Sequence, residues 1–320
     1  MAPAARRRRT TARSSPIAAI LGPTASGKSA LAIALAARLP VEILVADSRQ
    51  VFRGLSIGTA KPSDADRAAV PHHLVDLVDP DEPFTVADWV RRARPLVDEI
   101  AGRGRIPLLV GGTGLYVSAL LDGYDFAAQP WSPEIRERLV AELESDGLRA
   151  LVERLTSFDP SAAQRTDLRN PRRVLRALER TEAGGRPSVP RSSAYPGRLA
   201  LIGISRPRAE LYRRINDRSA RLFQAGLIAE VRGLLATGYR ADSPALASHG
   251  YAEAVRHLAG QLTLEEAMAS TARRTRQYAK RQTSWFRRDP RIVWIAAGDA
   301  PGCDQALAER ARGLVDRLLA

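Results

Sequence analysis

The stretch IAAILGPTASGKSALAIALAARLP, residues 17–40, is the most informative part of this 320-residue chain about its fold. An apolar run is followed by GPTASGKS (22–29), which matches the pattern G-x4-G-K-[ST], and then by a helical pattern that ends at Pro40. A glycine loop between a strand and a helix is the arrangement of a P-loop, whose backbone N–H groups cradle a di- or triphosphate. We expect Lys28 to neutralise phosphate oxygens and Ser29 to hold Mg²⁺. The expected phosphate-binding residues are Gly22, Pro23, Thr24, Ala25, Ser26, Gly27, Lys28 and Ser29.

Further apolar runs predict an α/β fold. Strands are expected at 41–46, 105–110, 199–204 and 291–297, with helical patterns between them. Continuous apolar strands that alternate with helices are typical of a parallel sheet covered on both faces. The predicted fold class is therefore a P-loop NTPase-like, mostly parallel sheet flanked by helices.

Strand patterns are missing from the middle of the chain. The helical segments SPEIRERLVAELESDG, LRALVERLTSF and NPRRVLRALERTEAGG follow one another there. They predict an all-helical insertion domain at 126–196, inside a P-loop catalytic core made of 17–125 and 197–320. Residues 1–16, MAPAARRRRTTARSSP, are rich in Arg and have neither an acid nor an apolar face. They predict a disordered arm rather than a transit peptide.

Composition limits the class of protein. A single cysteine, Cys303, excludes an intramolecular disulfide and a zinc site built from several cysteines, and it fits a cytoplasmic protein. No apolar stretch reaches the roughly 18 residues of a membrane span. The net charge is +14, yet only Lys28, Lys61 and Lys280 among 49 basic residues are lysines. Such lysines are candidates for sites that need a compact ammonium, although any one could remain by chance.

The run LVADSRQVFRG (44–54) ends an apolar strand on an acid. We expect this strand to run beside the first one, so that Asp47 lies at the same sheet edge as the P-loop. Asp47 could accept a proton from a nucleophile, hold a metal as in an NTPase, or only cap a turn. IGTAKP (57–62) and GGTGLY (111–116) should meet the same edge. Thr113 could bind substrate there or act as a helix N-cap.

Two acid-poor basic segments indicate contact with nucleic acid. They are RNPRRVLRALER (169–180) and TARRTRQYAKRQTSWFRR (271–288), and the second interleaves its cations with Tyr278, Trp285 and Phe286. Cations that bind phosphates beside rings that stack on unpaired bases are typical of an RNA-binding surface. With roughly six phosphate contacts, binding should weaken steeply as salt rises.

Seven ordered motifs carry a family resemblance: GPTASGKS, DSRQVFRG, IGTAKP, PHHLVD, GGTGLY, RNPRRVLRALE and AKRQTSWFR. Between residue 17 and about 290 the chain resembles the tRNA dimethylallyltransferase (tRNA isopentenyltransferase, IPP transferase) family. The resemblance implies transfer of a dimethylallyl group from dimethylallyl diphosphate to N6 of the adenine just 3′ of the anticodon, with release of pyrophosphate. It implies that the P-loop and Mg²⁺ hold the diphosphate, and that the adenine is flipped into a channel with Asp47 near its middle.

The resemblance also implies roles for residues. Asp47 is the expected general base, Lys28 stabilises the leaving group, and the diphosphate-contacting arginine of LYRRINDRSA is taken as Arg214 in preference to Arg218. A monomer is expected, because nothing in the sequence requires a partner subunit. The residues assigned to the anticodon stem-loop are Asp47, Ser48, Arg49, Gln50, Thr113, Arg136, Arg172, Arg173, Arg176, Lys280, Arg281, Gln282 and Trp285.

Some positions depart from the family's pattern. Ser248 and His249 replace Ala and Ile, and Phe52 stands where Tyr is common, which puts local tRNA contacts in question more than the chemistry. His72 and His73 belong to PHHLVD, which the family shares, and we interpret them as structural.

Two other classes of protein stay open. One is a P-loop kinase or NTPase that acts on a small molecule, and the other is a non-catalytic RNA-binding protein with a relic P-loop. The polar DSRQ run and the basic segments count against the first class. The intact Lys28, Ser29 and Asp47 count against the second.

Overall fold

The computed structural model of the chain describes residues 15–124, 132–184, 194–299 and 302–320. Most of the predicted arm lies outside these residues, as do parts of the predicted insertion domain at 126–131 and 185–193. The chain divides into two compact units. One unit contains Met1–Leu121 and Tyr195–Ala320, and the other is Asp122–Ala194.

Six strands of the first unit form one sheet in the order β3-β2-β4-β1-β5-β6, and every neighbouring pair is parallel. The strands are β1 (Ile17–Leu21), β2 (Val41–Ala46), β3 (His72–His73), β4 (Ile106–Gly111), β5 (Leu199–Ser205) and β6 (Ile292–Ala296). The predicted fold class is therefore confirmed. The structure adds β3, which is too short to show a strand pattern in the sequence.

One expectation about this sheet is wrong, because β2 does not run beside β1. The central strand β4 lies between them, so that Val110 pairs with Ile20 on one side and with Val45 on the other. The chain leaves β2 for the edge strand β3 and returns to fill the gap only later. Since all strands are parallel, the carboxyl ends of β1, β2 and β4 still open on one edge of the sheet.

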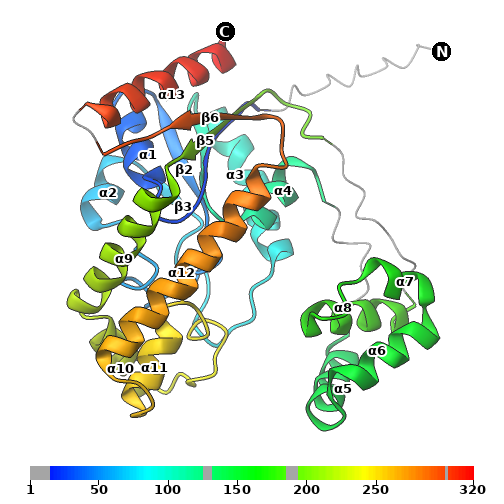
Figure 1. Cartoon of the computed structure of the whole chain (residues 1–320). Helices are drawn as coiled ribbons and strands as arrows, with labels where there is room; N and C mark the ends of the chain where they lie inside the picture. The colour runs from blue at the N-terminus through cyan, green and yellow to red at the C-terminus, as the bar shows by residue number, and fades with distance from the viewer. Residues whose placement is uncertain (1–14, 125–131, 185–193, 300–301) are drawn as a thin grey trace, which may run out of the picture. The chain divides into compact units, whose positions relative to one another are not determined.

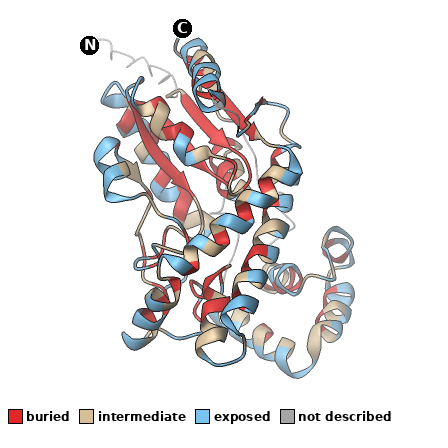
Figure 2. Ribbon diagram, turned by 60° about the vertical axis from the view of Figure 1, so that its left-hand side comes forward, coloured by how far each residue is buried: buried red, intermediate tan, exposed pale blue. Residues whose placement is uncertain are grey.

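Helices cover both faces of the sheet (Figure 1). Helices α1 (Lys28–Ala36) and α13 (Cys303–Leu319) pack on one face, where Leu35 and Val315 share a core with alternate strand residues. Helices α3 (Val86–Gly102) and α4 (Gly114–Leu121) cover the other face. The strands are buried almost throughout, as Figure 2 shows in red, which explains why they read as unbroken apolar runs. A short helix, α2 (Asp64–Ala69), precedes β3.

The helical tract between β5 and β6 consists of four helices: α9 (Arg208–Gln224), α10 (Leu227–Ala236), α11 (Tyr251–Leu258) and α12 (Leu264–Phe286). The long helix α12 packs against α9 and α11. It begins at a capping box, in which Thr263 and Glu266 satisfy each other's backbone N–H groups.

The second unit is entirely helical within its described residues, with α5 (Pro133–Ser145), α6 (Gly147–Phe158), α7 (Pro160–Arg165) and α8 (Pro171–Glu182). Leu139, Leu155 and Leu178 are buried in a core of its own. Three of the helices have Pro in the first turn, after a Ser, Asp or Asn cap whose side chain accepts a backbone N–H.

The end of the predicted N-terminal arm is packed on the first unit. The Ser15 hydroxyl donates to the Asp98 carboxylate at 3.0 Å, and its carbonyl accepts the Tyr195 hydroxyl at 2.6 Å. Among the described residues, no helix combines the length and the apolar character that crossing a membrane requires.

Candidate functional site

The P-loop lies between β1 and α1, and its shape is held by side chains that are distant in the sequence. Gly27 and Ala25 have positive φ angles of 104° and 66°. The Arg206 Nε donates to the Ser26 carbonyl at 2.9 Å, and the Arg214 Nε donates to the Ala25 carbonyl at 3.1 Å. Two guanidinium groups therefore bind consecutive carbonyl oxygens of the loop.

A pocket of about 300 Å³ opens beside the loop. Its wall includes five cations and two carboxylates, so the net charge of the lining is positive. This favours an anionic ligand. The charged lining residues are Lys28, Lys61, Arg214, Arg218, Arg221, Asp47 and Asp66.

Burial disfavours the charged forms of two of the pocket cations, Lys28 and Arg218. Burial lowers the pKa of the Lys28 ammonium to about 8; the Asp47 charge opposes this shift and Arg218 adds to it. Burial also lowers the pKa of the Arg218 guanidinium, again against the attraction of Asp47. Lys28 Nζ donates to the Pro23 carbonyl at 2.7 Å. An anion bound in the pocket would pair with both cations and so favour their charged forms.

Asp47 directly follows β2, and the next residues are fixed by backbone contacts. The Asp47 carboxylate accepts the Arg49 N–H at 2.8 Å, and the Thr113 hydroxyl accepts the Ser48 N–H at 3.1 Å. The structure therefore places Asp47, Lys28 and Thr113 at one edge of the sheet, although β4 rather than β1 is the neighbour of β2.

The two candidate arginines of α9 differ in their environment. Arg214 is anchored to Ala25 and also to Asp299, at 2.9 Å. Arg218 lies deeper, and it makes a long hydrogen bond of 3.5 Å to the Thr59 carbonyl. Both line the pocket, but Arg214 helps to hold the loop while Arg218 faces Lys28 and Asp47. Arg218 therefore competes strongly with Arg214 for the role of diphosphate ligand.

Gln282 is placed differently from a surface contact to tRNA. Its side chain is buried, its carbonyl oxygen accepts the Thr24 N–H at 2.8 Å, and its amide donates to the Gly112 carbonyl at 2.9 Å. The amide thus joins the P-loop to the end of β4. Gln282 lines the pocket, but both of its side-chain polar atoms are hydrogen-bonded to backbone groups.

Tyr278 and Arg206 are site residues that the sequence assignment missed. The Tyr278 side chain forms hydrogen bonds with Thr113 and Gln282, and burial together with the Asp47 charge raises its pKa. A signal existed for Tyr278, because it lies four residues before Gln282 and so on the same face of α12. The sheet-edge argument that places Asp47 also applies to Arg206, which directly follows β5.

Other assigned residues lie near the pocket on exposed or half-buried positions. Gln50 donates to the Thr59 and Ala60 carbonyls, both at 3.3 Å, and Arg49 donates to the Pro244 carbonyl at 2.8 Å. Trp285 is 39% exposed, and its ring lies so close to Gly114 that a Cβ there would come within 2.3 Å. Lys280 and Arg281 are exposed on α12.

His249, which departs from the family's pattern, also faces this region. Its ring packs edge-on against Tyr278 with centroids 5.5 Å apart, and its Nδ1 is buried without a hydrogen-bond partner in the described structure. Burial lowers the pKa of His249 to about 4, so the ring is neutral at physiological pH. Of the PHHLVD histidines, His73 bonds to the buried Glu42 carboxylate at 2.7 Å, at the other end of β2.

The assigned arginines of the second unit fall into two kinds. Arg136 is paired with the buried Glu179 at 2.8 Å. Arg172, Arg173 and Arg176 are exposed along α8. Their assignment to tRNA stays a prediction.

No group of three metal-ligating side chains occurs among the described residues. Ser29 and Asp47, however, line the same pocket as the P-loop. A hydroxyl and one carboxylate beside a diphosphate fit Mg²⁺, which usually takes few protein ligands together with phosphate oxygens and water.

The fold and this pocket define a P-loop protein. Its sequence matches the IPP transferase family model over residues 50–289 and the isopentenyl transferase model over residues 15–71. The chain therefore belongs to the IPP transferase family and is an enzyme, as the seven motifs predicted.

Relatives and a solved structure agree with this assignment. The tRNA dimethylallyltransferase of Heliobacterium modesticaldum is 45% identical over 87% of this chain and 88% of its own length. That of Thermobifida fusca is 46% identical over 94% of both chains. The crystal structure of the full-length tRNA isopentenylpyrophosphate transferase from Bacillus halodurans is 39% identical, has a TM-score of 0.70, and matches 96% of this chain and 98% of that one.

Proposed function

We propose that this enzyme transfers a dimethylallyl group from dimethylallyl diphosphate to N6 of the adenine just 3′ of the anticodon in tRNA. The observation that carries the proposal is the shared pocket of Lys28, Asp47 and Arg218, in which one carboxylate lies among buried cations beside a P-loop. The family assignment and the tRNA dimethylallyltransferase relatives support the same reaction.

Each part of the pocket suits one part of this reaction. The N6 lone pair attacks C1 of the dimethylallyl group, the C–O bond breaks, and pyrophosphate leaves with the bonding electrons. Lys28 and Arg218 stabilise the charge that develops on the leaving group. Asp47 accepts the proton that N6 loses, and such general base catalysis contributes about 10²- to 10⁴-fold.

Mg²⁺ is the proposed cofactor. When bound beside the P-loop, it would neutralise diphosphate charge, and Ser29 is the residue best placed to hold it. The proposal needs no second metal, because the P-loop N–H groups and Lys28 bind the phosphates directly.

The substrate tRNA is proposed to meet three sets of residues. Ser48, Arg49, Gln50 and Thr113 contact the flipped nucleotide, and the exposed Trp285, Lys280 and Arg281 of α12 contact the neighbouring strand. The helical unit, as an insertion domain, contacts the anticodon stem-loop through Arg172, Arg173 and Arg176. We further propose a cytoplasmic monomer, because tRNA is a cytoplasmic substrate and one chain supplies the whole pocket.

The direct test is a transfer assay. The protein is incubated with dimethylallyl diphosphate labelled in its prenyl carbons, Mg²⁺, and unmodified tRNA that has adenine at the target position. Label should enter tRNA, and digestion should recover it on N6 of that adenine. A tRNA with guanine at the target position is the matched control and should take up none.

A parallel reaction with ATP tests the kinase or NTPase alternative. Hydrolysis or phosphoryl transfer from ATP at a rate above that of prenyl transfer would overturn the proposal. Binding of tRNA with no reaction of either kind would instead favour the non-catalytic RNA-binding protein.

A further inference from the structure

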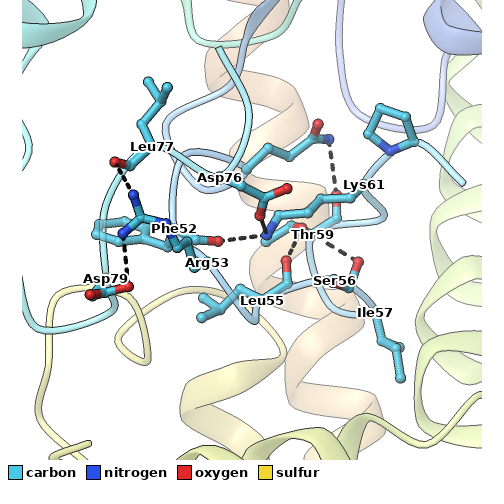
Figure 3. A network of polar contacts seen from close by, with 12 residues as sticks. Phe52, Arg53, Leu55, Ser56, Ile57, Thr59, Lys61, Asp76, Leu77 and Asp79 are labelled. Atoms are coloured by element: carbon cyan, nitrogen blue, oxygen red, sulfur yellow. Dashed lines mark hydrogen bonds and ion pairs between the residues drawn. The ribbon is translucent and has the colours of Figure 1, made fainter. Parts of the chain in front are cut away.

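Lys61 is a lysine of this Arg-rich chain whose role the pocket chemistry leaves open. Its side chain is 3% exposed, and the ammonium donates to the Phe52 carbonyl at 2.6 Å and forms an ion pair with Asp76 (Figure 3). Although burial opposes it, hydrogen bonds from Lys61 and Arg67 lower the pKa of Asp76. The Asp76 carboxylate is therefore charged at physiological pH.

The ion pair lies where the end of the Asp47 run meets two other segments of the chain. The Asp76 N–H donates to the Gln50 carbonyl at 3.1 Å, and the Leu77 and Val78 N–H groups donate to the Val51 carbonyl at 2.7 and 3.1 Å. On the other side, the Gln50 amide binds the carbonyls of the loop that carries Lys61. Residues 50–53, 55–61 and 76–78 are thus bonded to one another, with the Lys61 ammonium between them.

Backbone conformation indicates that this unit is held firmly. Ala60, Leu74 and Asp76 all have positive φ angles, of 49°, 68° and 56°, and none is glycine. Such conformations cost about 1–3 kcal/mol each and persist where surrounding contacts over-determine them, often at functional sites.

The helices below hold the same loop from its other end. The buried Tyr251 hydroxyl accepts the Gly58 N–H at 3.1 Å and also bonds to Glu230, which accepts the Ile57 N–H at 2.8 Å. The Tyr251 ring lies where a Cβ on Gly58 would come within 2.2 Å. The loop is therefore fixed at 56–58 by α10 and α11 and at 61 by Lys61.

We propose that Lys61 is a positioning residue for the transfer reaction: through Asp76 and Phe52 it sets the placement of Asp47 and Gln50 against the adenine. This inference rests on the proposed function. Because Lys61 also lines the pocket, a direct contact to the diphosphate is the competing role. The two roles differ in which substrate they affect.

A lysine suits this place better than an arginine. The ammonium is compact and can donate to a carbonyl and a carboxylate in a space that the solvent hardly reaches. A guanidinium is larger and planar, so it would push the Phe52 carbonyl or Asp76 away.

The experiment compares Lys61→Met and Lys61→Arg with a matched control, Arg67→Met. Arg67 pairs with the same Asp76 at 2.9 Å but is 39% exposed. We expect Lys61→Met to lower kcat for transfer about 100-fold, since a misplacement of about 1 Å can have that effect. The KM for dimethylallyl diphosphate should change less than about threefold. Lys61→Arg should not restore kcat, and Arg67→Met should stay within about threefold of the natural protein.

Three outcomes would overturn the proposal: a kcat of Lys61→Met near that of the natural protein, an increase confined to the KM for the diphosphate, or an equal loss in Arg67→Met. If Lys61→Met fails to fold, judged by circular dichroism and thermal unfolding, Asp76→Asn decides. It removes the charge partner and should lower kcat about tenfold, and an unchanged kcat would refute the inference. Absence of transfer by the natural protein would refute the proposed function instead.

Discussion

The cations around the P-loop and the cations along α8 and α12 are held in different ways. Arg206 is 2% exposed and binds the Ser26 carbonyl, while Lys28 binds the Pro23 carbonyl. Arg172, Arg176 and Lys280 are exposed on helix surfaces. The first set is held against backbone carbonyls in a space of low dielectric, and the second set is exposed to water and salt.

This difference predicts two kinds of behaviour. A buried charge acts strongly on one atom, so its removal should change a specific step of the reaction. An exposed charge is screened by salt within about 10 Å, so surface cations should act as a sum and be nearly interchangeable. Mutations in the two sets therefore test whether buried and exposed cations differ in this way.

The largest effect is expected for the carboxylate that the buried cations surround. Asp47→Asn keeps an oxygen that can accept the Arg49 N–H but removes the base, so transfer should fall by about 10³-fold. Binding of dimethylallyl diphosphate, measured by titration calorimetry, should survive. Loss of that binding would mean that Asp47 holds metal or structure rather than a proton.

The next effect should separate the two pocket arginines. Arg218→Gln removes a charge that faces Lys28 and Asp47, and should lower kcat about 100-fold, as removal of one donor to a developing anion does. Arg214→Gln should cost about tenfold, because Arg214 acts mainly by holding the Ala25 carbonyl. Single-turnover kinetics would measure both, and the reverse order would restore Arg214 as the diphosphate ligand.

A smaller effect should appear as the pH rises. The pKa of Lys28 is about 8 in the ligand-free protein, so its ammonium loses its proton as the pH passes through 8. Since the charged form binds phosphate, the dissociation constant of the diphosphate should rise above pH 8, up to about tenfold per pH unit. Lys28→Arg is the control, because a guanidinium stays charged and its binding curve should remain flat to pH 10 or so. A flat binding curve for the natural protein would contradict the assignment of Lys28 as a phosphate-binding cation with a lowered pKa.

The smallest effects belong to the surface set. Arg172→Gln or Arg176→Gln should each raise the KM for tRNA by about two- to fivefold and reduce the slope of log K against log salt by about 1. The KM for the diphosphate should not move. An effect as large as that of Arg218→Gln would show that α8 also makes a specific contact. It would contradict the proposed difference between buried and exposed cations.

Local patterns in the sequence predicted much of this structure. The P-loop and five of the six strands follow from apolar runs and glycine, which act over a few residues. The order of strands could not be read in this way, because β4 enters between β1 and β2 from about 60 residues further along the chain. The edge strand β3 has only two residues and so shows no period.

The site shows the same division. Lys28, Asp47 and Thr113 each follow a strand, so a parallel sheet brings them to one edge whichever strands are neighbours. The contacts of Gln282 with Thr24 and of Arg206 with Ser26 join residues 258 and 180 positions apart. The packing of α12 decides the first contact and the pairing of β5 with β1 the second, and both depend on the whole core.

The scarcity of lysine makes this enzyme suited to chemical footprinting. An amine-selective reagent would find three side-chain amines in the whole chain. Lys280 is exposed and should react at once, whereas Lys61 is nearly inaccessible. Lys28, whose pKa is about 8, should react when its pocket is empty and be protected when a diphosphate covers it. A ratio of two labelled peptides would then report pocket occupancy, with Lys280 as the internal standard.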